Sequence, residues 1–346
     1  MLTLVCPRCK GALSEMEQAH RCLRCGATWP HRDGVLSLAS DRYVYDAIPR
    51  EELRAMVAHV RERGMAALRE AAAQRPYRKA ARHALDKSKA DGRLLVEMTR
   101  ESSVLNVGCG LGVISLAFAQ VAGRVIAADP TLECALFVQA RSTAEGVTNV
   151  VPLHAGVFDL PFDGPTFDVV VLNGVLEWVP VSVQDGRPRE VQLRALRTLG
   201  SLLEREGQLY VAIENRTGCQ FLVGAQDHGG THFTSLLPRW GASVVTMLRH
   251  GRSYRAYTYT YPGYVSLFRE AALRVERAYA AFPDHRRLRR VCEVRDIWRV
   301  RGALGEHCSR VERALVEAGA ALGRPWLFVP AFIFVLKRET KGAAGA

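Results

Sequence analysis

The sequence lacks a long apolar run and lacks any segment typical of a secretory leader. No basic stretch followed by an apolar core precedes Cys6, and the most apolar segment, Pro325 to Leu336, is short and interrupted by Pro330. Nine cysteines among 346 residues are too few for a disulfide scaffold. We therefore expect a cytoplasmic protein with reduced cysteines and no membrane span.

Positive charge is present in excess. The 47 Lys and Arg residues exceed the 35 Asp and Glu residues to give a net charge of +12, and 48% of the residues are apolar, which excludes a disordered chain. The charge is +7 over residues 1–100, −6 over 101–238 and +11 over 239–346. The two basic flanks predict a phosphate-bearing partner, either RNA or a phosphorylated small molecule.

Two Cys-x-x-Cys pairs lie near the N-terminus, Cys6 with Cys9 and Cys22 with Cys25, separated by twelve residues. This is zinc-ribbon spacing, in which four thiolates close a tetrahedral site with no open position for chemistry. We predict a structural zinc ion on these four cysteines; the alternative is a ribbon without its metal. A redox pair would need one such motif beside a βαβ pattern, which is absent here.

Residues 2–40 resemble the small domain related to Trm112, a methyltransferase partner subunit. The resemblance lies in the CPxCKGxL opening and the WPxxDGVLxL close of this segment. It implies association with a methyltransferase acting on RNA, protein or a small molecule, and it selects none of these acceptors.

A glycine loop follows an apolar strand in the sequence VLNVGCGLG, residues 104–112, and a helical pattern follows the loop. Glycines at 108, 110 and 112 let a ligand lie against main-chain N–H groups at the helix start. The next strand ends in Asp129, 21 residues beyond Gly108, where a carboxylate can accept both hydroxyls of a ribose. Val113 stands where a dinucleotide fingerprint needs Gly or Ala, which argues against a nicotinamide or flavin cofactor. The alternative is an ordinary strand-to-helix turn.

From about residue 95 to 280 the chain resembles the class I S-adenosylmethionine-dependent methyltransferases. The resemblance is carried by VLNVGCGLGVISLAFA, VIAADPTLECALFVQAR, LPFDGPTFDVVVLNGVLEWV and GQLYVAIENRTG. It implies a Rossmann-like α/β fold with a seven-stranded sheet whose last strand is antiparallel. It also implies that S-adenosylmethionine contacts Asn106, Gly108, Gly110, Gly112 and Asp129.

The chain departs from this family at the acid that often faces adenine, because Gly156 occupies its position. We therefore expect adenine contacts through the backbone at Gly156 and Val157, and further cofactor contacts from Asn173 and Gly174 at the end of the strand 167–172. Glu177 follows this strand; a helix-start carboxylate is the preferred interpretation of it, and an acid-base group is the alternative. Asp159 is left without a role.

The acceptor-binding part is predicted in a polar, glycine-rich segment that begins at Glu214. It contains ENR-x-G and D-H-x-G elements, similar to a bacterial methyltransferase subgroup associated with glycoconjugate and specialised-metabolite pathways. His228 is the candidate general base, because an imidazole titrates near neutral pH. The alternative is a loop histidine bonded to backbone groups.

Further along, residues 252–264 alternate basic and aromatic side chains, which fits either stacking on bases or sugars or a half-buried strand. We expect a helix over 264–273, a strand over 274–282, an arginine-rich helical insertion over 285–301 and a final strand over 327–336.

These features predict three parts: a zinc ribbon at 1–40, a helical linker or lid at 41–100, and a methyltransferase domain at 101–346 with insertions at about 215–262 and 284–325. The predicted activity is methyl transfer from S-adenosylmethionine to a small-molecule or glycan acceptor. Two alternatives stay open, an RNA methyltransferase and a non-catalytic methyltransferase-like partner subunit.

Overall fold

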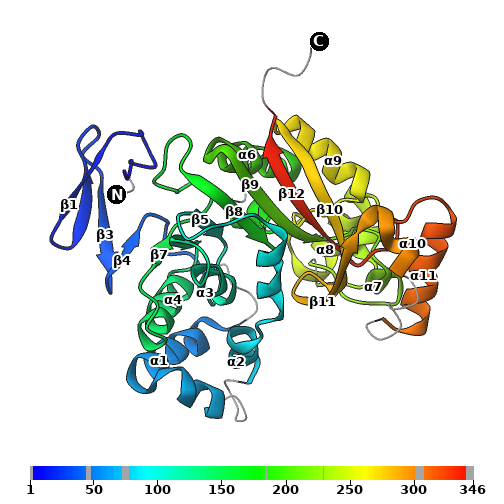
Figure 1. Cartoon of the computed structure of the whole chain (residues 1–346), viewed down its shortest axis with the longest axis horizontal. Coiled ribbons are helices and arrows are strands. Elements are labelled where there is room, and N and C mark those ends of the chain that lie inside the picture. The colour runs from blue at the N-terminus through cyan, green and yellow to red at the C-terminus, as the bar shows by residue number, and fades with distance from the viewer. Residues whose placement is uncertain are drawn as a thin grey trace. The chain divides into compact units, whose positions relative to one another are not determined.

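The computed structural model describes residues 3–43, 48–71, 78–183, 185–228, 230–300 and 308–339. The chain divides into two compact units, and Figure 1 labels most of their helices and strands. The first unit contains residues 1–171 and 201–208, and the second contains 172–200 and 209–346. The predicted linker residues 44–47 and 72–77, Gly229 of the D-H-x-G element, and residues 301–307 lie outside the described part.

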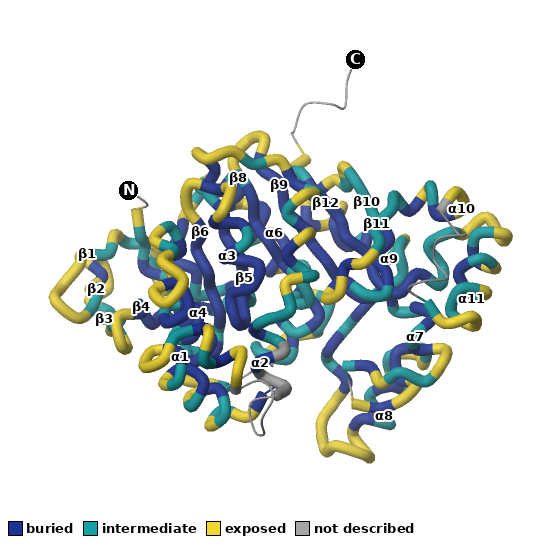
Figure 2. Tube along the Cα trace, turned by 60° about the horizontal axis from the view of Figure 1, so that its bottom comes forward, coloured by how far each residue is buried: buried dark blue, intermediate teal, exposed yellow. Residues whose placement is uncertain are grey.

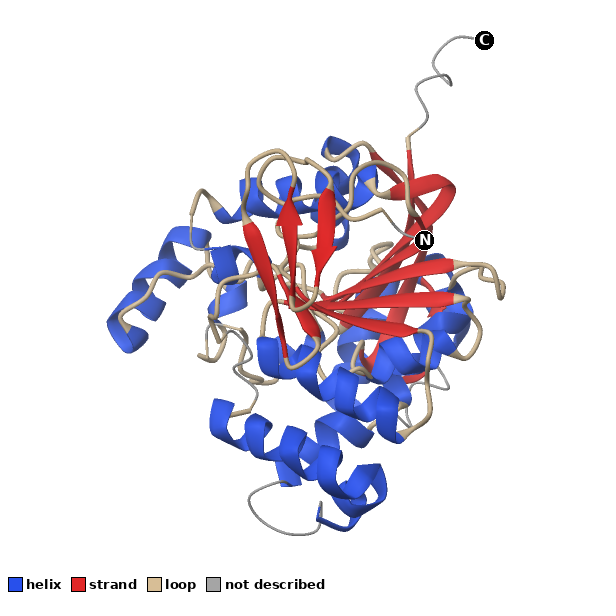
Figure 3. Ribbon diagram, turned by 90° about the vertical axis from the view of Figure 1, so that its left-hand side faces the viewer, coloured by secondary structure: helices blue, strands red, loops and turns tan. Residues whose placement is uncertain are grey.

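The first unit begins with four short strands, β1 (Leu13–Met16), β2 (Ala19–Cys22), β3 (Thr28–Arg32) and β4 (Val35–Ser37), drawn as red arrows in Figure 3. Successive strands pair antiparallel, but β4 also pairs parallel with β7 (Val150–His154), where Leu36 lies opposite Leu153. The N-terminal strands therefore extend the sheet of the α/β region.

That region alternates strands and helices in the order β5 (Ser103–Val107), α3 (Val113–Ala119), β6 (Arg124–Asp129), α4 (Leu132–Ala144), β7 and β8 (Phe167–Asn173, through Val171). The β5, β6 and β7 strands are parallel, and their side chains are almost all buried, as expected for strands covered on both faces. The described strands of this unit follow the order β1-β2-β3-β4-β7-β6-β5-β8. The predicted seven-stranded sheet is thus wrong: β4 continues the ladder at the β7 edge, where the resembled family would end.

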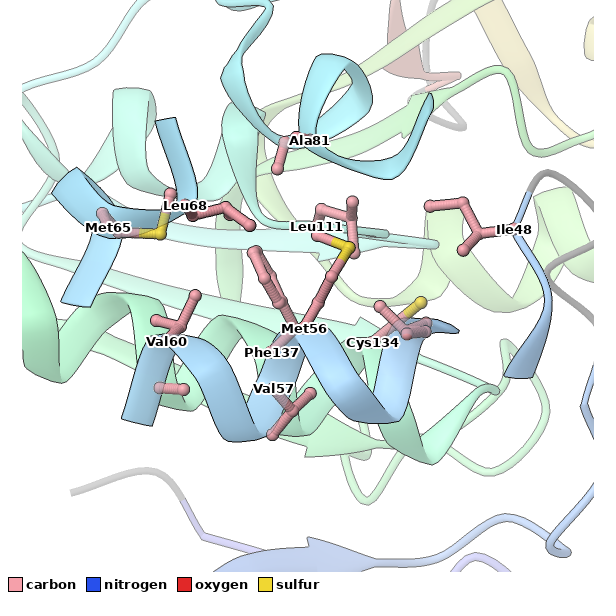
Figure 4. Close-up of a cluster of buried hydrophobic side chains, with 13 residues drawn as sticks. Ile48, Met56, Val57, Val60, Met65, Leu68, Ala81, Leu111, Cys134 and Phe137 are labelled. Atoms are coloured by element: carbon pink, nitrogen blue, oxygen red, sulfur yellow. The ribbon is translucent and has the colours of Figure 1, made fainter. Parts of the chain in front are cut away.

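Helix α1 (Arg50–Ala71) packs against α4 through a cluster of buried apolar side chains, shown in Figure 4. Met56 and Val57 of α1 and Phe137 of α4 belong to this cluster. At its edge, Arg50 and Arg54 approach the buried carboxylate of Glu133 at 2.6 and 2.9 Å. The helix α2 (Arg78–Leu85) and the 3₁₀ segment η1 (Ser88–Leu95) complete the part of the chain predicted as a linker or lid.

The second unit contains the antiparallel strands β9 (Leu203–Glu214, from Leu209 onward), β12 (Ala331–Arg338), β10 (Leu273–Asp284) and β11 (Arg287–Glu293), adjacent in that order. Its helical elements are α5 (Val179–Val183), α6 (Pro188–Ser201, through Gly200), α7 (Cys219–Leu222), η2 (Thr234–Leu236), α8 (Arg239–His250), α9 (Tyr261–Glu270), η3 (Val294–Asp296), α10 (Ile297–Val300) and α11 (Arg310–Ala321). Figure 2 shows the loop after α8 as exposed. Among the described residues, no helix combines the length and apolar character needed to cross a bilayer.

The structure agrees with the predicted strand at 274–282 and with an antiparallel last strand. It contradicts the first half of the arginine-rich helix predicted at 285–301, because β11 occupies Arg287–Glu293 and forms a hairpin with β10, whereas η3 and α10 are helical over 294–300. The carboxylate of Asp284 accepts the N–H groups of Arg286 and Arg287 at 2.6 and 2.9 Å, which fixes this tight turn. The local turn and the pairing with β10 outweigh the helical preference of the arginines.

Candidate functional site

The four N-terminal cysteines converge, and their Sγ atoms all lie within 4.8 Å of one another. The Sγ atoms of Cys6 and Cys25 are 3.7 Å apart, and those of Cys9 and Cys22 are 3.4 Å apart. The N–H of Cys25, helped by that of Arg24, lowers the pKa of Cys22 to about 6, although burial opposes this. Thiolate-stabilising N–H groups around four converging sulfurs match the donor set of a structural zinc site.

The cysteine module is tied to the α/β sheet by a buried polar contact as well as by β4. Ser37 Oγ lies 2.7 Å from Nδ1 of His154, and Nε2 of His154 lies 3.1 Å from the carbonyl of Pro130. Since the Pro130 carbonyl can only accept, Nε2 carries the proton and Nδ1 accepts from the serine hydroxyl. Burial lowers the pKa of His154, so this histidine is a neutral structural link.

The glycine loop joins β5 to α3 in the geometry that the sequence predicts. Gly108, Gly110 and Gly112 have φ angles of 69°, 51° and 73°, a region that favours glycine. A Cβ atom on Gly112 would also lie 2.9 Å from a methyl group of Val138. Asn106, predicted to contact the cofactor, donates its amide N–H to Ser115 Oγ at 2.8 Å and so links β5 to α3.

Asp129 lies at the end of β6, beside the glycine loop. Its two carboxylate oxygens accept the N–H groups of Gly110 and Thr131, each at 2.9 Å. Burial raises the pKa of Asp129 to about 6 despite these two hydrogen bonds. Each oxygen retains further acceptor capacity, so the carboxylate can still receive hydroxyl groups.

A carboxylate also reaches Gly156, although the sequence has none there. Asp159, three residues further on, folds back so that its Oδ2 accepts the N–H of Gly156 at 3.2 Å, while its own N–H donates to the Gly156 carbonyl at 3.0 Å. Burial raises the pKa of Asp159. Val157 between them is buried. The turn therefore restores an acidic group where the sequence pattern lacks one.

In the second unit, Asn173 ends β8 and Gly174 follows with a φ of 64°. The N–H of Gly174 donates to the carbonyl of Ala212 at 2.8 Å. A Cβ atom at Gly174 would lie only 2.6 Å from Nε2 of His285. Gly174 thus leaves the space that His285 occupies, a role the sequence did not reveal.

A buried cluster of acids and histidines forms beside these residues. Nε2 of His228 lies 3.6 Å from Oε1 of Glu177 and 3.4 Å from Oε1 of Glu214, and the side chains of Glu177, His228 and Glu214 are 0%, 7% and 10% exposed. Nδ1 of His285 is 3.9 Å from the same Glu214 oxygen, to which Arg286 donates at 2.9 Å.

The four ionisable side chains of this cluster differ in the direction of their pKa shifts. Burial, and then the neighbouring Glu214, raises the pKa of Glu177 to about 7. Burial opposes the charge on Glu214, but His228, His285 and Arg286 lower its pKa well below the ordinary value. Burial would lower the pKa of His228, yet Glu214 and Glu177 raise it, while burial lowers the pKa of His285 to about 4. Near neutral pH these shifts favour an ionised Glu214 and a neutral His285.

Glu177 lies two residues before α5, which begins at Val179, and its buried side chain faces His228. His228 was the candidate base, and its ring packs edge-on against Trp178 with centroids 5.0 Å apart. Glu214 and His285 were missed as functional candidates. The ENR-x-G element contained Glu214, but its spacing from His228 gave no sign that the two side chains meet.

The basic and aromatic alternation at 252–264 does not form the half-buried strand that was one of its two interpretations; an isolated bridge joins Tyr259 to Asn215. Arg239 lies over the rings of Tyr257 and Tyr259, at 4.0 and 5.3 Å from their centroids. The Tyr259 hydroxyl donates to Gln192 at 2.8 Å. These aromatic groups contact the protein itself, and their proposed stacking on bases or sugars stays a prediction.

Residues 104–198 match the model of a family described as a methyltransferase domain. The chain is 31% identical over 137 residues to the ubiquinone biosynthesis O-methyltransferases of Xanthomonas euvesicatoria pv. vesicatoria and Xanthomonas campestris pv. campestris, a match covering 39% of this chain and 52% of each relative. The chain thus spans about half the length of the curated relatives it matches.

Similar solved structures include the YcgJ protein of Bacillus subtilis, with 18% identity, a TM-score of 0.43 and coverage of 73% of this chain and 99% of that one. Another is the CcbJ methyltransferase of Streptomyces caelestis, with 14% identity, a TM-score of 0.46 and coverage of 73% and 95%. The family match covers both the glycine loop and Asp129.

Proposed function

We propose that this chain is an S-adenosylmethionine-dependent methyltransferase that methylates a hydroxyl oxygen of a small-molecule acceptor. The observation that carries the proposal is the linkage of Gly110 to Asp129 within the segment that matches a methyltransferase domain. The names of the curated relatives, which are O-methyltransferases of ubiquinone biosynthesis, support an oxygen acceptor on a small molecule. A glycan or RNA acceptor stays a prediction without comparable support.

The first unit would bind the methyl donor. The loop at Gly108, Gly110 and Gly112 leaves main-chain groups open to the methionine and ribose parts, and the Asp129 oxygens would accept the ribose hydroxyls. The carboxylate of Asp159, held at Gly156, would accept the adenine amino group in place of the missing family acid. The donor contacts predicted for Asn173 and Gly174, which belong to the second unit, stay predictions.

The second unit would serve the acceptor, with His228 as the predicted base. The acceptor hydroxyl gives its proton to Nε2 of His228 while its oxygen forms a bond to the methyl carbon. The bond from that carbon to sulfur breaks, and S-adenosylhomocysteine leaves with the electron pair. Glu214 and Glu177 would stabilise the imidazolium that results.

The four cysteines would hold structural zinc, which keeps the N-terminal strands folded at the β7 edge of the sheet. This role needs no open coordination position and places the metal outside the chemistry.

The donor proposal is tested by isothermal titration calorimetry with S-adenosylmethionine. Asp129→Ala should weaken binding by at least about tenfold, because a bidentate, charge-assisted contact is lost. Asp163→Ala is the matched control, since this exposed carboxylate lies in the same domain outside the loop. Equal donor affinity in Asp129→Ala and the wild type would refute the proposed donor site.

The acceptor proposal is tested with hydroxylated aromatic and sugar acceptors. His228→Gln should lower kcat by about 10² or more with donor affinity unchanged, which is the usual contribution of a general base. His232→Gln is the control, because this histidine lies in the same segment and contacts the Gly224 carbonyl instead of the cluster. An unchanged kcat in His228→Gln would remove His228 from the reaction.

A further inference from the structure

Three buried side chains from separate parts of the second unit bring oxygen and nitrogen donors together. Glu177 follows β8, Glu214 ends β9, and His228 comes from the polar segment after α7. We propose that Glu177, Glu214 and His228 bind a divalent cation, whose remaining coordination positions take a hydroxyl oxygen of the acceptor.

The spacing of these donors fits ligands around one ion. One ligand atom from each of the three residues lies within 4.8 Å of the others, and Nε2 of His228 is 3.4 and 3.6 Å from the two carboxylates. Ligands bound at about 2.0–2.2 Å in a tetrahedral arrangement lie about 3.4 Å from one another. Good hydrogen bonds to oxygen would measure about 2.7–3.2 Å. The three groups are therefore close enough to share an ion but too far apart to satisfy one another fully.

Hydrogen bonding leaves the same donors unsatisfied. Within the part of the chain that the structure describes, both carboxylate oxygens of Glu177, Oε2 of Glu214 and Nε2 of His228 are buried without a hydrogen-bond partner. Buried polar atoms are costly when they remain unpaired, so such a concentration of them at one point needs a ligand. A cation accepts lone pairs from all three side chains at once.

The surrounding residues provide an independent indication. His285 is fully buried, both of its ring nitrogens lack a hydrogen-bond partner among the described residues, and its Nδ1 lies 3.9 Å from Oε1 of Glu214. Gly174 is the residue that makes room for His285. Arg286 donates to Oε1 of Glu214 at 2.9 Å and so orients this carboxylate while leaving Oε2 unengaged. Such outer contacts commonly position metal ligands.

Two carboxylates and one imidazole suit ions such as Mn²⁺, Fe²⁺ and Zn²⁺, and three protein ligands leave positions open. An acceptor hydroxyl bound at an open position ionises more readily, with its proton released to solvent. When Nε2 of His228 binds the cation it cannot accept a proton. His228 therefore acts either as a metal ligand or as the general base, and not as both at once. The role of the acceptor oxygen rests on the proposed methyltransferase function, but cation binding does not.

The experiment is a titration of the full-length, zinc-loaded protein with Mn²⁺ in the absence of methyl donor, followed by the electron paramagnetic resonance signal of free Mn²⁺. Thiolate sites disfavour Mn²⁺, so the N-terminal cysteines do not compete. We expect one saturable site, weakened at least tenfold by Glu177→Gln and by His228→Gln and unchanged by the control His232→Gln. Circular dichroism verifies the fold of each variant. If one of the two cluster variants does not fold, the other one carries the test.

Absence of saturable Mn²⁺ binding, or equal binding by the wild type and the folded cluster variants, would overturn the cation site. Absence of S-adenosylmethionine binding by the wild type in the separate calorimetric experiment would instead refute the proposed function and leave the cation site standing. If protein that binds no cation still transfers methyl groups at the full rate, the proposed role of the cation at the acceptor oxygen is refuted. The proposed methyltransferase function is unaffected by that result.

Discussion

Replacing Asp129 by Asn should make the protein more stable and, at the same time, a weaker binder of the methyl donor. The side chain is only 4% exposed, and burial raises its pKa from 3.8 to about 6. The charged form is therefore disfavoured in the folded state. Each pKa unit corresponds to about 1.4 kcal/mol, so the ionised carboxylate costs the fold about 3 kcal/mol at neutral pH.

Asparagine removes this cost but keeps only one acceptor oxygen. The carboxylate of Asp129 accepts the N–H groups of Gly110 and Thr131, and the side-chain amide that replaces it can accept only one of them. Losing the other hydrogen bond leaves a buried N–H unpaired, which costs about 1–3 kcal/mol. The free energy of unfolding of Asp129→Asn should therefore exceed that of the wild type by up to about 2 kcal/mol at neutral pH.

The sign of the pH dependence follows from the raised pKa. The penalty for the charged carboxylate is absent below the unfolded pKa of about 3.8, grows as the pH rises toward 6 and is constant above it. The advantage of the variant should thus disappear near pH 4. Urea unfolding at neutral pH and near pH 4, with calorimetric titration of S-adenosylmethionine, measures both effects. A variant less stable than the wild type at neutral pH would refute the assigned cost of burying Asp129.

Three other results are expected. Donor affinity of the wild type should fall as the pH drops below about 6, since the protonated form of Asp129 loses acceptor capacity; a flat calorimetric profile between pH 5 and 8 would contradict this. Cys22→Ser, or removal of zinc by a strong chelator, should unfold the N-terminal strands, seen as faster proteolysis within residues 1–40 while the α/β region stays intact. Ser37→Ala should lower the free energy of unfolding by about 1–3 kcal/mol, because it leaves Nδ1 of the buried His154 without its donor; Ser40→Ala is the control in urea unfolding.

Local features were predictable because short stretches of chain determine them. Glycines at 108, 110 and 112 indicated left-handed backbone between a strand and a helix, and the structure has it there. The two Cys-x-x-Cys pairs indicated four converging sulfurs, which the structure confirms. Asp129 was correctly predicted at the end of a strand beside the loop, because the number of residues between the loop and the end of the next strand indicates this position.

Other features depended on pairing partners that a local pattern cannot specify. The arginines after Asp284 resemble a helix in isolation, but pairing with β10 makes them a strand. The sheet exceeds seven strands because β4 pairs with β7, which lies more than a hundred residues further along the chain. Asp159 reaches Gly156 only through a specific turn.

By itself, the sequence determined the residues of the glycine loop, the acid after it and the cysteine module. The tertiary structure alone decided that Glu177, Glu214 and His228 meet, and that His285 lies beside them in the space left by Gly174. The physical reason is that loops and strand ends carry no periodic pattern that records where their side chains point. Their convergence is set by packing of the whole unit, which buries the charges together and thereby shifts their pKa values.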